Sequence, residues 1–496
     1  MNTFMNGLEN AYNLTRTSNG ALAHKSTRSM VYDMFALGGA YRSRTVEDCI
    51  LLFKNALEEN ESLAMKCLFY LRDCRGGQGE RRFFRVCFKW LANSEYSDAA
   101  LRNLDNVSDF GRWDDLIYTC VGTKLEKDAL TIIKRQLYLD LQCKTPSLLA
   151  KWLPSENASS KETIKMGNII REHLGISHKE YRKILSLLRA RINIVERLMS
   201  ANRWDEIEFD KIPSKAGLIY KNAFARRDII AKKYEAFAKS EKTTVNAKTL
   251  FPYDVVAKAV GTNCGWSYNF PKLSDTDRAM IEKYWENLPD YLNGQPCKMM
   301  CVVDTSGSMT GSTADAPLNV AISLGMYCAE RIGGPFKNHY ISFSRDPKLV
   351  KIQGVDFVDK VRRIYADNLC ENTNLTKTFD MLLDIASNPS VKEEDIPETI
   401  VVISDMQIDC NSYWDAKTTE TEMERVRRKW EAKGLKCPKL VYWNVHASKN
   451  TILDSGKDVT FVSGCSPVIF EQVLTGVTGY QLMLDKLMSN RYETVK

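Results

Sequence analysis

The sequence contains no apolar run long enough to cross a membrane, which takes roughly eighteen consecutive residues. Its first twenty residues lack the basic and apolar segments of a secretory signal, so we expect the protein to stay in the cytoplasm. No phosphate-binding loop of the GxxxxGKS or GxxxxGKT type occurs. These absences argue against a membrane protein, a secreted protein and a P-loop nucleotide hydrolase.

The fourteen cysteines are scattered singly, and no two of them have CxxC spacing. Cys297 and Cys301 come closest, but they flank a predicted strand, where alternation points both side chains to one face without closing a metal tetrahedron. Many of the others lie inside apolar runs, where a thiol acts as a small hydrophobic group. This pattern predicts a reduced intracellular protein without a disulfide framework or a zinc site.

Basic residues are only slightly in excess, with 69 Lys+Arg against 62 Asp+Glu, but they are unevenly placed. Residues 1–295 hold 45 basic and 36 acidic residues, whereas residues 296–496 hold 24 and 26. Residues 151–250 alone hold 21 and 12. A local excess of this kind indicates a polyanionic partner. A solvated helical surface would give the same counts, and charge alone leaves both interpretations open.

The first 290 residues are predicted to form helix after helix, as one of at least two domains in a chain of 496 residues. Apolar residues recur at three- and four-residue spacing, and turn residues separate the segments 45–60, 61–74, 80–93, 125–141 and 179–199. Thr45 and Ser177 are expected to cap two of these helices. Short loops between helices predict stacked hairpins, as in a HEAT-like solenoid or ring.

Residues 296–496 have a different pattern, in which β-branched apolar strands alternate with helices. Strands are predicted at 298–304, 338–343, 348–352, 399–405, 439–445 and 459–464. Helices between most of them predict a parallel, doubly wound α/β sheet of the Rossmann-like kind. The turn-rich stretch 287–296 is the expected domain boundary.

Oxygen-bearing side chains follow two of the predicted strands. Asp304 ends the first strand and begins a DxSxS pattern with Ser306 and Ser308, while Asp405 ends the strand 399–405. Thr373 lies in a loop before a helix and offers a further hydroxyl. Ligands of such sheets bind at the carboxyl ends of the strands, and oxygen donors with few charges suit Mg²⁺ or Mn²⁺. We therefore predict a divalent cation site with one position open for an outside ligand.

The segments VVDTSGSM, TNL and VVISDMQ resemble, in that order, the metal-ion-dependent adhesion site of von Willebrand factor A domains. The resemblance covers residues 297–496. It implies that Asp304, Ser306 and Ser308 are ligands, that Thr373 is a fourth, and that Asp405 binds directly or through water. The alternative is a degenerate site, in which the serines only cap the following turn. No histidine lies near the motif in the sequence, so we expect no catalysis and interpret the site as a docking point for an acidic partner.

Four segments of the helical half, at 13–39, 70–86, 106–116 and 178–207, resemble a poorly characterised family that joins a helical-repeat region to a von Willebrand A domain. That family is similar to the TROVE domain of the Ro autoantigen, through its architecture and the motifs RGGQGERR and GRWDDL. The resemblance to Ro implies a ring of helices that binds small non-coding or misfolded RNA.

Several basic residues are candidates for RNA contacts. They are Lys25 and Arg28 beside His24, then Arg75, Arg81, Arg82 and Arg85 around a glycine-rich turn, and Lys179, Arg182, Lys183, Arg189 and Arg191 with Tyr181 available for base stacking. Structural alternatives exist. Arg82 and Arg85 are placed to pair with Glu80, residues 112–116 suit a packing and capping motif, and Trp113, Trp152 and Trp204 are more typical of a core.

The leading hypothesis is thus a non-catalytic, monomeric RNA-binding scaffold with a Mg²⁺-dependent docking site for a protein. The alternative is a protein–protein interaction or assembly module that recruits an acidic partner without RNA. A Mg²⁺-dependent hydrolase ranks last, because the sequence shows no evident base or nucleophile.

Overall fold

The computed structural model describes residues 5, 9, 11–192, 194–262, 270–343, 347–367, 374–409, 421–454, 456 and 458–496. Over these ranges, no helix is both long enough and apolar enough to cross a bilayer. The chain forms two compact units. Unit 1 comprises Met1–Ala64 and Ala247–Ser489, and unit 2 comprises Met65–Asn246 and Asn490–Lys496.

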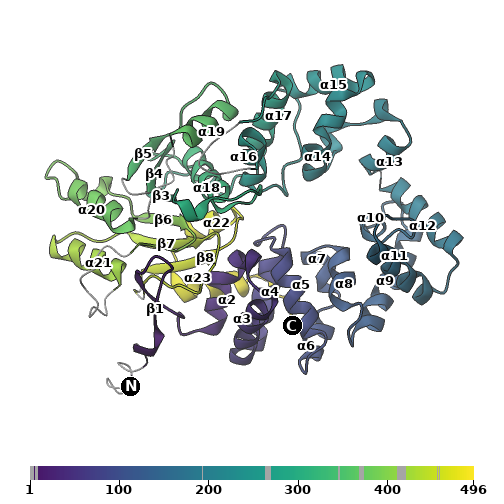
Figure 1. Cartoon of the computed structure of the whole chain (residues 1–496), viewed down its shortest axis with the longest axis horizontal. Helices are drawn as coiled ribbons and strands as arrows, with labels where there is room; N and C mark the ends of the chain where they lie inside the picture. The colour runs from purple at the N-terminus through teal and green to yellow at the C-terminus, as the bar shows by residue number, and fades with distance from the viewer. Residues whose placement is uncertain are drawn as a thin grey trace. The chain divides into compact units, whose positions relative to one another are not determined.

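Unit 1 is built on a six-stranded sheet in the order β5–β4–β3–β6–β7–β8 (Figure 1). The strands are β3 (Met299–Asp304), β4 (His339–Phe343), β5 (Lys348–Lys351), β6 (Thr399–Ser404), β7 (Lys439–Asn444) and β8 (Val459–Ser463). Neighbours are parallel except β4 and β5, which pair antiparallel. The α/β class is confirmed. The prediction of a parallel sheet is wrong at this edge, because the few residues between β4 and β5 cannot hold a crossover helix.

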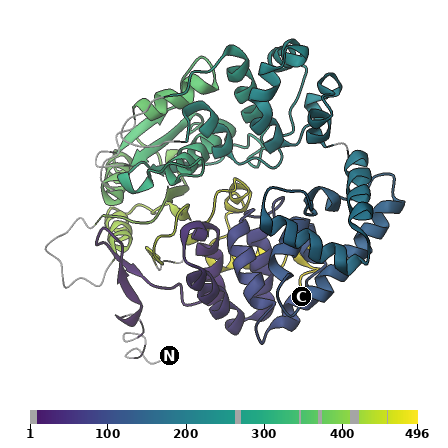
Figure 2. The same ribbon diagram turned by 45° about the vertical axis from the view of Figure 1, so that its right-hand side comes forward.

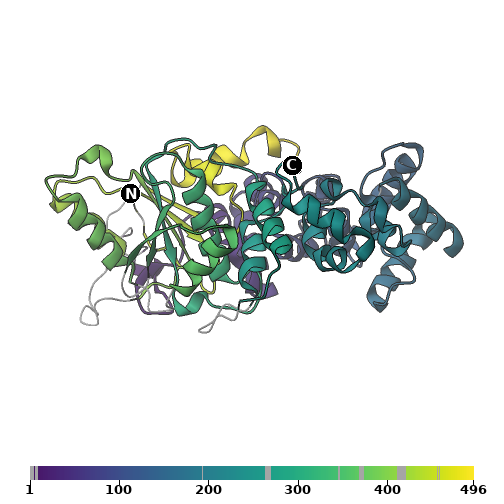
Figure 3. The same cartoon turned by 90° about the horizontal axis from the view of Figure 1, so that it is seen from above.

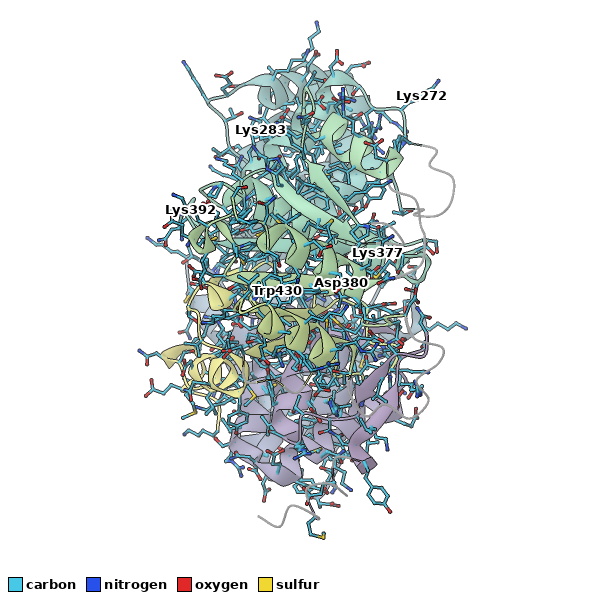
Figure 4. All side chains as sticks on the ribbon, turned by 90° about the vertical axis from the view of Figure 1, so that its left-hand side faces the viewer. Lys272, Lys283, Lys377, Asp380, Lys392 and Trp430 are labelled. Carbon is cyan, nitrogen blue, oxygen red and sulfur yellow. The ribbon has the colours of Figure 1, made fainter. Side chains whose placement is uncertain are left out.

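Helix α18 (Pro317–Arg331) packs against β3, β4 and β6. Gly325 permits the close approach, since a Cβ there would lie 2.5 Å from Cγ2 of Val303. The other helices of this part are α16 (Pro252–Val260), α17 (Asp275–Glu286), α19 (Phe357–Ala366), α20 (Leu375–Ala386), α21 (Glu422–Ala432), α22 (Ile469–Val473) and α23 (Gly479–Leu487). Figure 4 labels Asp380 on α20 and Trp430 on α21, two helices that pack on each other.

The N-terminal 64 residues pack in the sheet unit, so unit 1 extends beyond the predicted domain of residues 296–496. They form β1 (Leu14–Arg16), β2 (Leu22–His24), α2 (Met30–Leu37), the 3₁₀ segment η1 (Gly38–Ser43), α3 (Val46–Glu59) and the start of α4 (Glu61–Arg72). Every residue of α2 from Val31 to Leu37 is buried, and α2 packs on β8. The Phe461 amide donates to the Tyr32 hydroxyl at 2.9 Å. An apolar helix without a polar face needs cover on all sides, and α3, η1 and α23 supply it together with β8.

The described residues of unit 2 form helices joined by loops, without a strand. Its helices are α5 (Arg81–Leu91), α6 (Ser97–Arg102), α7 (Asn106–Phe110), α8 (Trp113–Cys120), α9 (Glu126–Gln142), α10 (Leu149–Trp152), α11 (Lys161–Leu174), α12 (His178–Arg191), α13 (Val195–Ser200), α14 (Ser214–Arg226) and α15 (Asp228–Lys239). Helices close in sequence lie side by side (Figures 2 and 3). The predicted caps are confirmed, because the Thr45 hydroxyl accepts from the Asp48 amide and Ser177 forms a capping box with Glu180. The single helix predicted at 179–199 is wrong, since α12 and α13 divide it.

The last seven residues also depart from the predicted domain 296–496, because they pack in unit 2. The Arg491 guanidinium donates to both carboxylate oxygens of Asp73, with Nη2 at 2.7 Å from Oδ1. The ring of Tyr492 stacks on Phe110 with centroids 5.5 Å apart. Asp73 is fully buried, so this short segment supplies the cation that a buried carboxylate needs.

Candidate functional site

The candidate metal site lies where the strand order of unit 1 reverses. From the central strand β3 the chain proceeds outward to β4 and β5, then returns to the other side of β3 as β6. Loops that leave β3 and β6 therefore diverge and open a crevice at the carboxyl ends of these strands, where α/β sheets bind ligands. Asp304 is the last residue of β3 and Asp405 follows the last residue of β6.

Hydrogen bonds hold the oxygen atoms of the loop after β3 close to one another. Asp304 is fully buried, and its Oδ1 accepts from the Ser306 amide at 2.9 Å. Its Oδ2 accepts from the Ser404 hydroxyl of β6 at 2.6 Å. The hydroxyls of Ser306 and Ser308 are 3.1 Å apart, and Ser308 is exposed to solvent. A buried carboxylate, a buried hydroxyl and an accessible hydroxyl thus converge within five residues.

Asp405 completes the group from the neighbouring strand. It is 3% exposed, and its Oδ1 accepts from the Gln407 amide at 3.0 Å. The Ser308 hydroxyl also bonds to its side chain and lowers the pKa of this carboxyl, against the rise caused by burial. Met406 adopts a φ of 62°, a left-handed conformation that few side chains tolerate. The chain therefore turns sharply just after Asp405.

The two carboxyl groups perturb each other. Burial, and then the nearby charge of Asp405, raise the pKa of Asp304 to about 7. Burial also raises the pKa of Asp405. Two acids placed together in a site that excludes water need either a shared proton or a bound cation. This electrostatic need is what a divalent metal ion would satisfy.

The chemistry of the donors fits Mg²⁺ or Mn²⁺. Carboxylate and hydroxyl oxygens are hard ligands, which these ions prefer. In the part of the chain that the structure describes, no three His, Cys, Asp or Glu side chains gather as a site for a metal ion, so this candidate site depends on the serine hydroxyls as well as on the two carboxylates. The fifth predicted ligand, Thr373, lies outside the described residues and directly precedes Asn374, which caps α20. Four of the five predicted residues are thus placed around one point.

A histidine that sequence reasoning missed lies beside this site. His446 follows β7 and lies close enough to Asp405 for an electrostatic interaction between the two side chains. Its Nε2 is 3.3 Å from the hydroxyl of Ser43. The statement that no histidine lies near the motif holds along the chain but is wrong in space, because Ser404 and Asn444 are register partners in adjacent strands. The proximity of His446 to the motif follows from the order of the strands and cannot be inferred from its distance along the sequence.

The hairpin of β1 and β2 is attached to the loop that follows Asp405. The Ser18 amide donates to Oε1 of Gln407 at 2.6 Å, and the Asn19 side chain donates to the Gln407 carbonyl at 2.7 Å. The Thr17 hydroxyl donates to the carbonyl of Ile408 at 2.7 Å. Residues from the beginning of the chain therefore help to fix the loop that carries the second carboxylate.

The predicted RNA-binding residues are divided between the two units. Lys25 and Arg28 belong to unit 1, where Lys25 Nζ donates to the Tyr12 carbonyl at 2.7 Å. The remaining six belong to unit 2, with Arg75, Arg81 and Arg82 at or before the start of α5 and Lys179, Arg182 and Lys183 exposed on α12. The guanidinium of Arg75 donates to the Asp109 carbonyl at 2.7 Å. Within unit 2 these residues therefore fall into two groups, one near the start of α5 and one on α12.

Three further candidates have structural roles. Tyr181 is fully buried and donates to the Pro154 carbonyl at 2.9 Å, so it cannot stack on a base as predicted. Arg189 donates to the carbonyls of Ala150 and Leu153, and Arg191 donates to carbonyls at the C-terminal end of α9. A guanidinium at the carbonyl end of a helix satisfies acceptors that the helix leaves open.

Arg72 and Arg85, on either side of the motif RGGQGERR, form one ion-pair network with the residues of GRWDDL, between α4, α5 and α8. Asp115, fully buried, accepts from Arg72 Nε at 2.8 Å, from Arg85 Nε at 2.6 Å and from the Arg112 amide at 2.9 Å. Arg85 therefore pairs with this helix start, and the prediction that it pairs with Glu80 is wrong. Glu80 instead caps α5. The packing and capping interpretation of residues 112–116 is the one that the contacts support.

Family comparison agrees with part of the sequence interpretation. The sequence profile of a domain of unknown function, DUF2828, matches residues 17–133 and 147–296, more than half of the chain. The chain belongs to the DUF2828 family. In this DUF2828 protein, the profile of a second domain of unknown function, DUF7788, matches residues 298–486. The resemblance to a poorly characterised family is confirmed, while the von Willebrand A class stays a prediction.

Individual relatives of this DUF2828 protein are also uncharacterised or distant. It is 28% identical over 507 residues to the "Uncharacterized protein L728" of Acanthamoeba polyphaga mimivirus, an alignment that covers 93% of this chain and 85% of that protein. It is also similar to the crystal structure of the Deinococcus radiodurans RO (RSR) protein. That similarity has a TM-score of 0.43 and 12% identity, and covers 93% of this chain and 99% of that chain.

Proposed function

We propose that this DUF2828 protein is a non-catalytic RNA-binding scaffold whose sheet unit is a von Willebrand A-type domain with a Mg²⁺ or Mn²⁺ docking site. One observation carries the metal site. Asp304 and Asp405 are buried together at the reversal of the strand order, within reach of the hydroxyls of Ser306 and Ser308. A loop with three oxygen donors after β3 and a carboxylate after β6 match the sequence motifs in register.

The ligands of the proposed site are Asp304, Ser306, Ser308 and Asp405, with Thr373 as the fifth. When bound, the cation supplies a positive charge that can accept one more oxygen ligand. Ser308 is exposed, so this edge of the site is open to a partner. A carboxylate of a protein partner is the group that a hard cation with an open position would bind.

The RNA-binding part of the proposal rests on how charge divides between the units. Unit 2 holds 36 Lys+Arg and 24 Asp+Glu, whereas unit 1 holds 33 and 38. The division by structural unit is sharper than the division at residue 295, so the basic excess belongs to the helical unit. A locally basic surface attracts phosphates by releasing counterions, and this binding is sequence-independent.

Two measurements test the two parts of this proposal, the metal site and the RNA binding. A thermal melt with and without Mg²⁺ should show stabilisation of the wild type that Asp304→Asn removes, since a ligand of the native state raises the melting temperature. An unchanged Mg²⁺ response in the variant would contradict the ligand assignment. Fluorescence anisotropy with single-stranded and duplex RNA should show binding that weakens as salt rises. Metal-dependent capture of an acidic peptide without any RNA binding would instead favour the protein-interaction module.

A further inference from the structure

One surface of unit 2 has more basic than acidic groups, and beside its ion-pair network lies an arginine, Arg81, that forms no ion pair among the described residues. This surface is formed by the first turns of α5 and α8 and by α10, and α8 packs on both of the other helices. Two carboxylates, Asp114 and Asp115, are almost completely buried there. Arg72, Arg85 and Arg112 already share them. Three guanidinium groups on two carboxylates leave one positive charge in excess before any other residue is considered.

Arg81 adds a fourth guanidinium to this group. It is exposed at the first position of α5, one turn before Arg85 on the same side of the helix. Within the described ranges it forms no ion pair of its own. Partial burial lowers its pKa, the charges of Arg112 and Arg85 lower it further, and those of Asp114 and Asp115 raise it. Because Arg72, Arg85 and Arg112 already bind these two carboxylates, Arg81 can donate its hydrogen bonds to an oxyanion at this point.

Aromatic rings lie among these cations. The guanidinium of Arg112 stacks over Trp152 with its carbon 3.9 Å from the ring centroid, and Lys151 Nζ is 5.5 Å from the same ring. The guanidinium of Arg85 lies 4.4 Å from the centroid of Tyr118, a side chain that is 41% exposed. Trp152 was predicted to be a core residue, and it is instead half-buried. Exposed aromatic rings beside basic groups are the composition of surfaces that bind single-stranded nucleic acid.

We propose that Arg81, with the charge of Arg112 nearby, binds a backbone phosphate of single-stranded RNA, and that Tyr118 and Trp152 stack on the adjoining bases. This inference rests on the proposed RNA binding and names its site. The guanidinium fork suits a phosphate because it donates two parallel hydrogen bonds. The guanidinium groups of Arg85 and Arg112 pack on the rings of Tyr118 and Trp152 and orient them.

The test uses the full-length protein and a short fluorescein-labelled single-stranded oligoadenosine in fluorescence anisotropy. Arg81→Gln should weaken binding about tenfold, and the slope of log affinity against log salt should fall by roughly 0.7, the loss of one contact to single-stranded phosphate. Tyr118→Ala should also weaken binding about tenfold through lost stacking. Lys89→Gln is the matched control, because it removes one exposed charge from the last turn of the same helix. It should leave the affinity within about twofold.

The outcomes separate this inference from the proposed function. If Arg81→Gln binds the oligonucleotide as tightly as the wild type and with the same salt slope, the proposed site is wrong, while the RNA-binding function still holds. Binding of duplex RNA alone, unaffected by Arg81→Gln, would do the same. Wild type that binds neither RNA would overturn the proposed function and the site with it. Arg81 forms no ion pair among the described residues, so circular dichroism of Arg81→Gln should match the wild type.

Discussion

Removal of the Asp115 carboxylate should strongly destabilise the helical unit. This carboxylate is fully buried and binds Arg72, whose side chain is 4% exposed, at 2.6 Å. In Asp115→Ala the guanidinium of Arg72 stays buried without a counterion, and the Arg112 amide at the start of α8 loses its acceptor. Breaking a buried pair by removing one partner costs about 3–5 kcal/mol. We expect the midpoint of urea unfolding, followed by far-UV circular dichroism, to fall accordingly.

An exposed pair in the same unit is the matched control. Asp105 and Arg135 also form an ion pair, but their side chains are 66% and 59% exposed. Asp105→Ala should leave the unfolding midpoint almost unchanged, because surface pairs contribute little. The double variant Asp115→Ala with Arg72→Met should recover part of the loss, since it removes the unpaired charge as well. Equal effects of Asp105→Ala and Asp115→Ala would refute the assignment of this network to the core of unit 2.

Three further outcomes are expected. The pKa of Asp304 is raised to about 7, so the metal-free native state binds this proton more tightly than the unfolded chain does. Its stability should therefore fall as the pH rises from about 4 to about 7, and the increase in melting temperature caused by Mg²⁺ should grow over the same range. An increase that does not depend on pH would contradict this expectation. Arg491→Ala should destabilise unit 2 by about 3 kcal/mol because it leaves the buried Asp73 uncompensated, whereas an unchanged urea midpoint would show that the C-terminal segment is dispensable. Gly325→Ala should reduce the free energy of unfolding by about 1–3 kcal/mol and so lower the melting temperature, because its Cβ would overlap with Val303. An unchanged melting temperature would mean that α18 can shift away from β3 at no cost.

Local patterns in the sequence were sufficient for the elements of the sheet unit. The predicted strand at 399–405 and helix at 317–332 correspond to β6 and α18 within one residue at each end. Strong β-branched runs and helical periodicity are local signals, and they survive in the folded chain. The antiparallel edge was missed because the pairing direction of β5 depends on the length of its connection.

Contacts between distant segments could not be predicted in this way. Helix α2 has the periodicity of any apolar helix, and nothing local indicates that it packs on β8, more than 400 residues away. His446 lies beside the candidate site through the order of the strands. The acids of GRWDDL were recognised as capping residues, but their pairing with Arg72 and Arg85 depends on three helices meeting. The local sequence shows which side chains can form ion pairs or caps, whereas the topology of the fold determines which residues they contact.

The central claim is that oxygen donors from two strands bind one divalent cation, and Mn²⁺ electron paramagnetic resonance tests it directly. Titration of Mn²⁺ into the wild type should show a single tight site for which Mg²⁺ competes. Asp304→Asn and Ser308→Ala should weaken it, whereas Ser312→Ala, an exposed hydroxyl in the same loop, should not. Mn²⁺ binding that is equally tight in the wild type and in Asp304→Asn would contradict the account.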